Sequence, residues 1–354
     1  MKIPRSRRDR GIALMVVMIA IFVLSVLAGA FAYSMKVETK LAMNADNETQ
    51  LIWLGRSGIE RARWILSFMS CPFDSLNQKW AGGPGADCEL NGPLADVDLQ
   101  NFTVGDGLIS LRITDLERKF NINAADEAVL QQSFTLVGID ASEIPAISAA
   151  ILDWIDPDDV PRVNGAESDF YQTLNPPYLS KNKPLDDLSE LLLVRGITPE
   201  MYWGSSSTNH APAAFQKVDR WGRPVEEPSY PVGIVDLFTA MSSGRVNVNT
   251  ASATVLQTIP GVDENAAAQI IKQRSGPDGA DGTEDDTPFQ NVGELINAGV
   301  SRQAMQNLPR YADTRSRTFD VEIDARIHGS RRIFHAILGR NNPRDIQVLS
   351  FYWD

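Results

Sequence analysis

The sequence predicts an α+β protein in which a long N-terminal α-helix packs on an antiparallel β-sheet, with a large all-α domain inserted between strands of that sheet. Three observations predict this fold class. An uncharged N-terminal segment continues as an amphipathic helical pattern, residues 108–120 and those after 318 alternate between apolar and polar side chains, and the region between them has a helical texture. With 354 residues, 43% of them apolar, the chain can bury more than one core.

Residues 12–35 form the first element, an uncharged segment that follows a short basic leader. As a helix these 24 residues rise about 36 Å, which is enough to cross a hydrocarbon core of roughly 30 Å. The positive charge before the segment predicts a cytoplasmic N-terminus and an exported remainder. The basic residues of the leader are Lys2, Arg5, Arg7, Arg8 and Arg10.

Three interpretations of this segment compete. A secretory signal would be cut near the small residues Ala28, Gly29 and Ala30, whereas a permanent anchor would stay uncleaved. A prepilin-type leader would be cut between Gly11 and Ile12, which leaves the apolar helix on the mature chain. The last interpretation is favoured, because apolar residues at helical spacing continue beyond the membrane segment and predict one helix of more than about 50 residues.

Charge and cysteine content limit the environment and the ligands. The chain has 33 basic and 45 acidic residues, and without residues 1–11 it keeps 28 and 44, a net charge of −16. Such a surface repels nucleic acid and favours cations. Cys71 and Cys88, the two cysteines, lie beyond the apolar segment. In an oxidising compartment such a pair usually forms a disulfide worth roughly 3 kcal/mol, and two free buried thiols are the alternative.

An internal repeat organises the helical region. KFNINAADEAVL (119–130) and RVNVNTASATVL (245–256) match at a constant offset of 126 residues, and each predicts a short strand followed by a capped helix. Residues 184–198 also resemble residues 288–301. The region therefore reads as two duplicated units, about 119–200 and 245–315, with chance similarity of short helices as the alternative.

Residues 256–274, LQTIPGVDENAAAQIIKQR, resemble a helix-hairpin-helix. In nucleic-acid-binding hairpins a second glycine lets backbone amides approach a phosphate. Asp263 occupies that position here, and a carboxylate repels phosphate. We therefore interpret the hairpin as a packing module and expect no nucleic acid partner.

Alternating segments flank the helical region. One lies at 108–120, and three more lie at 319–329, 331–340 and 345–354. Their apolar and charged residues fall on opposite faces, as in an antiparallel sheet with one solvated side, and residues 328–330 predict a hairpin turn. The helical region then becomes an insertion into one sheet.

Together these segments resemble a known family. The leader, the long helix, NINAADEAVL (121–130), DWIDPDDVPRVNGAESDFY (153–171), RVNVNTASATVLQTIPGV (245–262) and the terminal strands are similar to protein K of the type II (general) secretion pathway, the large minor pseudopilin family. The resemblance implies a leader at 1–11, a transmembrane helix at 12–35, a pilin-like helix and first strands at 36–118, an inserted domain of two helix-hairpin-helix-like (SAM-like) repeats at 119–315, and C-terminal strands at 316–354.

The same resemblance implies a function. Prepilin peptidase would cut after Gly11 and methylate Ile12. The chain would be a single-pass protein of the bacterial inner membrane with its bulk in the periplasm. It would join other minor pseudopilins, proteins I and J, in the tip complex that initiates and caps the periplasmic pseudopilus, a fibre of major pseudopilin used to export folded proteins.

Val16 supports a position at the tip. It is the fifth residue after the expected cut, where major pilin-like subunits carry a glutamate thought to pair with a neighbour's N-terminal amine. A charge at membrane depth costs about 2.5–3.5 kcal/mol unless it is paired. A subunit with no neighbour above it lacks that partner, so valine is the less costly residue.

Two acidic loops are candidate Ca²⁺ sites, because this cation takes six to eight oxygen ligands from flexible loops. The first candidate, at 276–289, offers Asp278, Asp281, Thr283, Asp285 and Asp286. The second and weaker candidate offers Asp153, Asp156, Asp158 and Glu167. A solvated acidic turn is the alternative for the first loop, and helix capping is the alternative for the second.

We expect no catalytic activity, because His210, His328 and His335 fit no zinc-ligand spacing and no phosphate-binding or nucleophile motif is present. A membrane-anchored periplasmic enzyme and a minor pilin of a type IV pilus-like or DNA-uptake system are the alternatives. Partner contacts are expected on the amphipathic part of the first helix, although its apolar face also fits packing on its own sheet. That face comprises Leu41, Leu51, Ile52, Leu54, Ile59 and Ile65.

Overall fold

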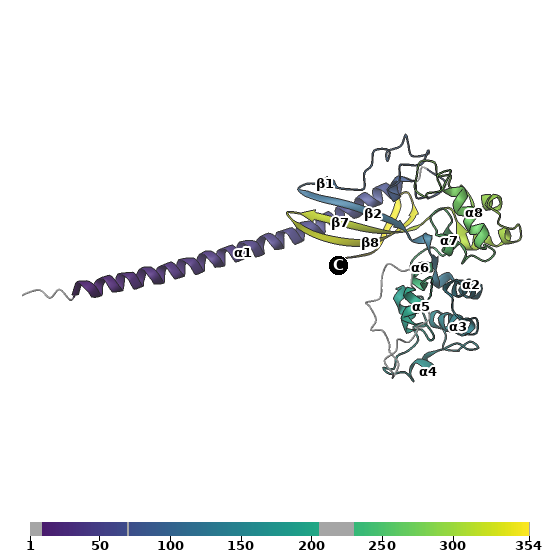
Figure 1. The fold of residues 1–354 in the computed structure, drawn as a ribbon, viewed down its shortest axis with the longest axis horizontal. Helices are drawn as coiled ribbons and strands as arrows, with labels where there is room; N and C mark the ends of the chain where they lie inside the picture. The colour runs from purple at the N-terminus through teal and green to yellow at the C-terminus, as the bar shows by residue number, and fades with distance from the viewer. Residues whose placement is uncertain (1–8, 69–70, 205–229, 354) are drawn as a thin grey trace, which may run out of the picture.

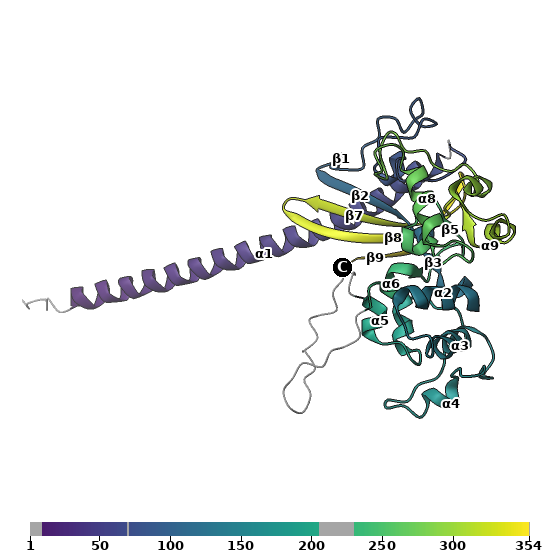
Figure 2. The same ribbon diagram turned by 45° about the vertical axis from the view of Figure 1, so that its right-hand side comes forward.

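The computed structural model describes residues 9–68, 71–204 and 230–353, so most of the leader and His210 lie outside the described residues. Figure 1 shows three parts along the long axis of the molecule: a protruding stem, a sheet, and a helical region at the end away from the stem. The view in Figure 2 places the helical region at the same end.

The stem is the first half of α1 (Asp9–Ser67), one unbroken helix of 59 residues, as predicted. Among the described residues, α1 is the one helix that is long and apolar enough to span a membrane. The mean hydropathy of its most apolar window is 2.9. Every described side chain from Ile12 to Asp46 is exposed. Burial begins at Asn47, after which one face of α1 packs on the sheet.

The sheet has the antiparallel strand order β1-β2-β7-β8-β9. The strands are β1 (Phe102–Val104), β2 (Gly107–Asp115), β7 (Thr318–Ile327), β8 (Ser330–Asn342) and β9 (Asp345–Trp353). Alternate residues face α1, among them Ile323, which is opposite Phe334 in the register. Gly58 allows the close approach of α1, since a Cβ there would lie 2.6 Å from a methyl group of Ile323.

The predicted hairpin turn joins β7 to β8. His328 and Gly329 have φ angles of 47° and 83°, the two successive positive values that a tight two-residue hairpin requires. Asn47 of α1 holds the turn in place, because its amide nitrogen lies 3.3 Å from the Ser330 hydroxyl and its amide oxygen lies 3.3 Å from His328 Nδ1.

The helical region fills the chain between β2 and β7. In chain order its elements are η2 (Leu116–Arg118), β3 (Phe120–Asn121), η3 (Ile122–Ala124), α2 (Glu127–Val137), α3 (Ile144–Ile155), α4 (Ser168–Tyr171), η4 (Leu188–Leu193), α5 (Pro199–Trp203), α6 (Ile234–Leu237), β4 (Phe238–Thr239), β5 (Val246–Asn247), α7 (Ala253–Leu256), α8 (Glu264–Arg274), η5 (Val292–Ala298), η6 (Ala304–Gln306), α9 (Leu308–Tyr311) and β6 (Ala312–Asp313). One further short helix, η1 (Lys79–Ala81), lies between α1 and β1.

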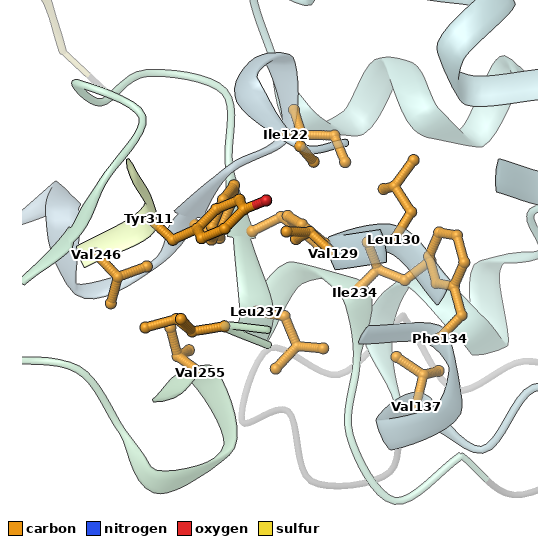
Figure 3. Packing of buried hydrophobic residues seen from close by; sticks show 14 of the residues in the cluster. Ile122, Val129, Leu130, Phe134, Val137, Ile234, Leu237, Val246, Val255 and Tyr311 are labelled. Atoms are coloured by element: carbon orange, nitrogen blue, oxygen red, sulfur yellow. The ribbon is translucent and has the colours of Figure 1, made fainter. Parts of the chain in front are cut away.

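One hydrophobic core runs through the whole helical region. Figure 3 shows Val129, Phe134 and Leu237 from its first part beside Val255 and Tyr311 from its second. The sheet and α1 enclose a separate core. Two cores agree with the predicted insertion of a helical domain into a helix-and-sheet domain.

Short parallel strand pairs frame each part of the helical region. β3 pairs with β4, and β5 pairs with β6. The first pair joins Phe120 and Asn121 to Phe238 and Thr239, a long-range pairing that leaves no local mark on the sequence.

The two units share a side-chain clamp. Asn123 donates to the Leu185 carbonyl at 3.0 Å and accepts from the Leu185 amide at 2.7 Å. Asn249, 126 residues later, donates to the Phe289 carbonyl and accepts from the Phe289 amide, both at 2.9 Å. The matching asparagines of the repeat thus bind the matching Pro-Leu and Pro-Phe segments.

A loop closed by a disulfide supports the junction between the two domains. Cys71 and Cys88 are bonded, with Cα atoms 5.6 Å apart. Arg315, where the chain returns to the sheet, donates to the Pro72 carbonyl at 2.7 Å and to the Cys71 carbonyl at 3.1 Å. Asp74 of the same loop forms a buried ion pair with Arg340 of β8.

Asp115, at the end of β2, lies at the centre of this junction. It is buried and accepts hydrogen bonds from Thr250 Oγ1 at 2.5 Å and from Ser316 Oγ at 2.6 Å. Burial, and next the nearby charge of Glu117, raise the pKa of Asp115 to about 8. The junction therefore contains a carboxyl group whose charge state changes near neutral pH.

Candidate functional site

The loop between α3 and α4 gathers three carboxylates. Ligand oxygens of Asp156, Asp158 and Glu167 lie within 4.8 Å of one another, which makes them the one such acidic group among the described residues. Glu167 is 3% exposed, and neither of its carboxylate oxygens has a hydrogen-bond partner. Asp156 Oδ1 is likewise buried without a partner. A buried unpaired carboxylate is costly, so the arrangement favours a bound cation.

Electrostatics at Glu167 agree with this geometry. Burial raises the pKa of Glu167 to about 7; the nearby Ser180 hydroxyl opposes this rise, and the neighbouring aspartates add to it. A divalent cation would remove this penalty, because its charge attracts the carboxylates that otherwise repel one another.

Asn182, which the sequence analysis did not single out, contacts the acidic loop. Its amide nitrogen donates to the Asp158 carbonyl at 2.8 Å, and its amide oxygen is buried without a partner. Asn182 comes 15 residues after Glu167 in a segment without acidic character, and only the fold brings it near the loop. Carboxylate and amide oxygens are the ligands of hard cations such as Ca²⁺.

Asp153 shapes the loop and lies outside the acidic group. It is fully buried and accepts from the backbone amides of Arg162 at 3.1 Å and Ala166 at 2.9 Å, and from the Arg162 guanidinium at 2.8 Å. Gly165 is required beside it, because a Cβ there would lie 1.8 Å from Asp153 Oδ2. Arg162 also forms an ion pair with Asp156.

The other predicted loop, at 276–289, is closed by its own side chains. Asp281 forms a two-bond ion pair with Arg274, at 3.0 and 2.6 Å. Asp285 accepts from the Asp278 amide at 2.9 Å and from Thr283 Oγ1 at 2.8 Å, and Asp286 accepts from the Gly282 amide at 2.7 Å. The unpartnered oxygens therefore lie in the loop that the sequence ranked second.

The predicted helix-hairpin-helix contains α7 and α8, which are joined by a turn at Gly261 with a φ angle of 89°. Asp263 is the N-cap of α8, and its carboxylate accepts from the Ala266 amide at 2.8 Å. The Ala266 amide at the start of α8 is thus used in the N-cap hydrogen bond. That this hairpin binds no nucleic acid remains a prediction.

The apolar face predicted for partners on α1 packs largely on the protein's own sheet. Leu51, Leu54, Ile59 and Ile65 are at most 5% exposed, whereas Leu41, below the sheet, is 62% exposed. The amphipathic pattern indicated a buried face but not what buries it. Ile52 is partly buried against the same core.

Comparisons with known proteins agree with the resemblance in the sequence. Residues 106–204 match the family described as type II secretion system (T2SS), protein K, and residues 242–278 match the helix-hairpin-helix motif. Type II secretion system protein K of Klebsiella pneumoniae is 32% identical over 214 residues, which are 56% of this chain and 61% of that protein. The protein of the same name from Pectobacterium carotovorum is 36% identical over 117 residues, 28% of this chain and 35% of that one.

The fold also resembles a solved structure. A chain in the crystal structure of the GspK-GspI-GspJ complex from the enterotoxigenic Escherichia coli type 2 secretion system superposes with a TM-score of 0.60 at 19% identity. The match covers 88% of this chain and 99% of that chain. The sequence matches span about three fifths or less of the length of the first relatives, whereas the shared fold extends over nearly the whole chain.

Proposed function

We propose that this chain, which belongs to the type II secretion system protein K family, is a minor pseudopilin that initiates and caps a periplasmic pseudopilus together with proteins I and J. One observation carries the proposal: a fully exposed apolar stem continues without a break into the helix that organises the sheet domain. Such a stem holds the domain at the membrane and leaves its own surface available to other helices.

The place of the helical domain supports a tip position. It lies at the end of the sheet away from the stem, where the next subunit of a fibre would stack (Figures 1 and 2). Val16 supports the same position, since it is 60% exposed on the stem and places no charge in the membrane. A Val16→Glu protein that functions identically would remove the second argument.

The function is tested with the full chain in its bacterial membrane. Mass spectrometry should find a mature N-terminus at methylated Ile12, as prepilin peptidase would produce, with the bulk of the chain accessible from the periplasm. Proteins I and J should co-purify with the chain, and export of a folded protein should stop when the chain is removed. A mature start near Phe31, or a fibre that carries this subunit along its shaft beside the major pseudopilin, would contradict the proposal.

We also propose that Ca²⁺ binds between α3 and α4 with a structural role. Asp156, Asp158 and Glu167 would hold it, with Asn182 beside them, because the three carboxylates lie within 4.8 Å of one another. Oxygens of Asp156, Glu167 and Asn182 are buried without a hydrogen-bond partner, whereas Asp158 is exposed. The cation would balance the carboxylate charges and tie the end of α3 to the start of α4. Chelator and added Ca²⁺ should shift the unfolding temperature in opposite directions, and equal melting curves would end the proposal.

We infer further that the helical domain is a duplicated helix-hairpin-helix-like unit. The support is the clamp that Asn123 and Asn249 repeat at an offset of 126 residues, together with the parallel strand pair that frames each unit. Loss of either asparagine should weaken the domain to a similar degree.

A further inference from the structure

A cleft between the sheet and the helical region takes no part in the function proposed above. Its volume is about 710 Å³, within the roughly 300–1,000 Å³ of ordinary ligand sites. One wall is the face of the sheet opposite α1, with Asp320 of β7, Ile337 of β8 and Tyr352 of β9. The other wall comes from the helical region and includes Val235 of α6, which lies below β9 in Figure 2. Both domains therefore form the cleft, and domain interfaces are common places for binding sites.

Asp320 is the carboxylate of the sheet wall. Its Oδ1 atom is buried and has no hydrogen-bond partner within the described residues. Burial raises the pKa of Asp320, which means that the chain itself stabilises the charged form poorly. A positively charged donor that entered the cleft would stabilise this carboxylate, since charge-assisted hydrogen bonds are about twice as strong as neutral ones.

The charges around the cleft favour a basic ligand. Lys119 already donates to the Val235 carbonyl at 2.7 Å, and Asp186 is already paired with Lys181 at 2.7 Å. The other acidic side chains of the lining still outnumber the other basic one, so the cleft attracts cations and repels anions. The acidic side chains are those of Asp115, Asp186, Asp187, Asp236 and Asp320, and the basic ones are those of Arg118 and Lys119.

A lysine or arginine side chain fits this cleft better than a metal ion. Among the described residues, three carboxylates come within 4.8 Å of one another between α3 and α4 alone, so those of the cleft lie too far apart for three of them to bind one ion. A long basic side chain instead packs its stem on apolar surface such as Ile337 and places its charge against a carboxylate and an aromatic ring. Asp320 and Tyr352 supply these two groups, from strands that lie about 10 Å apart.

The edge of the sheet favours an extended polypeptide as the carrier of that side chain. β9 borders the cleft and is the last strand of the sheet, so its outer edge pairs with no strand in the described part of the chain. Residues 346–353 of β9 carry no charge, whereas charges commonly protect an edge strand from pairing. An extended peptide can bond to this edge and place alternate side chains on the face that carries Tyr352.

We propose that the cleft binds an extended segment of a soluble polypeptide, with a lysine or arginine side chain held between Asp320 and Tyr352. A soluble polypeptide is favoured over a membrane-anchored subunit, because the cleft lies on the face of the sheet opposite α1. Subunits that share the membrane would assemble along α1, so this last step rests on the proposed function.

Fluorescence anisotropy with the full chain in detergent micelles tests the cleft. The probe is a labelled seven-residue peptide of alternating valine and lysine, and the matched probe has glutamate in place of lysine. The basic peptide should bind at least tenfold more tightly than the acidic one, and Asp320→Asn or Tyr352→Ala should weaken its binding at least fivefold. Asp324→Asn is the control and should change nothing, since Asp324 lies on the same strand and face but outside the cleft, paired with Arg326 and Arg331.

Two results would overturn the assignment. Equal binding of both peptides, or a loss with Asp324→Asn as large as with Asp320→Asn, would mean unspecific attraction to an acidic surface. Tyr352→Phe keeps the ring and should retain most of the binding. Neither Asp320→Asn nor Tyr352→Ala should lower the melting temperature, because Asp320 Oδ1 has no hydrogen bond to lose and Tyr352 is 48% exposed.

Photocrosslinking in the bacterium identifies the source of the segment. A photoreactive amino acid at position 352 should give an adduct with a soluble protein, whereas the same group at position 163 should give none, since Val163 is 86% exposed and lies outside the cleft. Adducts of position 352 with protein I or J would overturn the choice of a soluble partner. If the basic peptide does not bind while proteins I and J still co-purify, the cleft proposal alone is wrong. If neither I nor J co-purifies with the unaltered chain, the proposed function fails whatever the peptide does.

Discussion

Glutamine at position 167 removes one of the three carboxylates of the candidate cation site and keeps the size of the side chain. Glu167 is 3% exposed and both its oxygens lack partners, a state that costs about 1–3 kcal/mol for a neutral group and more for a charged one. Without calcium, Glu167→Gln is therefore expected to match the original chain or to exceed its stability by about 1 kcal/mol.

With calcium the order reverses. A ligand at 100 times its dissociation constant stabilises the folded state by about 2.7 kcal/mol, and the variant loses most of that gain because one of the carboxylates that would bind the ion is missing. The two proteins should thus change rank between chelator and calcium. Such an inversion follows from a cation site, whereas a simple packing defect lowers stability under both conditions.

Hydrogen exchange of the full chain measures the effect locally. Peptides that cover residues 153–171 should exchange more slowly with Ca²⁺ in the original chain and should not change in Glu167→Gln. Asp285→Asn in the other acidic loop is the matched control and should keep the calcium response. If Asp285→Asn abolishes the response and Glu167→Gln does not, the cation binds in the loop at 276–289 and the reasoning from unpartnered oxygens is wrong.

Three further predictions concern the two cores and their junction. Asp115 has a higher pKa in the folded chain than in the unfolded chain, so its contribution to stability is full below about pH 4, falls as the pH rises and is gone above about pH 8. Asp115→Asn should therefore flatten the decline in unfolding free energy measured between about pH 5 and 8. Asn249→Ala leaves the buried Phe289 amide and carbonyl unpaired, and chemical denaturation should show a loss of about 2–4 kcal/mol. Gly58→Ala places a Cβ 2.6 Å from a methyl group of Ile323 and should lower the unfolding free energy by about 1–3 kcal/mol in the same assay. An unchanged denaturation midpoint would mean that α1 can shift on the sheet to make room.

Local patterns in the sequence were sufficient to predict the elements whose apolar and polar residues follow one clear periodicity. An uncharged run gives the stem, alternation gives the strands, and His328 with Gly329 gives the turn, because each depends on neighbouring residues. The same reasoning singled out the acidic loop at 153–167, of whose four residues the structure brings Asp156, Asp158 and Glu167 together. Asp153 is bonded to Arg162 instead of joining the acidic group. Asn182 reaches the loop from a chain segment that only the fold brings close.

The proposed duplication offers a reason why one acidic loop keeps unpartnered oxygens and the other does not. In each part the loop follows the longer of two helices and is held to the last turn of that helix by a partly buried ion pair, with the charges reversed between the two parts. Asp153 of α3 holds Arg162 of its loop, whereas Arg274 of α8 holds Asp281 of its loop. In the second unit the remaining aspartates bind the loop's own amides and hydroxyl. In the first, both Glu167 carboxylate oxygens are buried with no hydrogen bond within normal geometry, and this is the observation behind the proposed cation. On this proposal, a shared frame with reversed charges yields one loop closed by its own side chains and one loop that binds a cation.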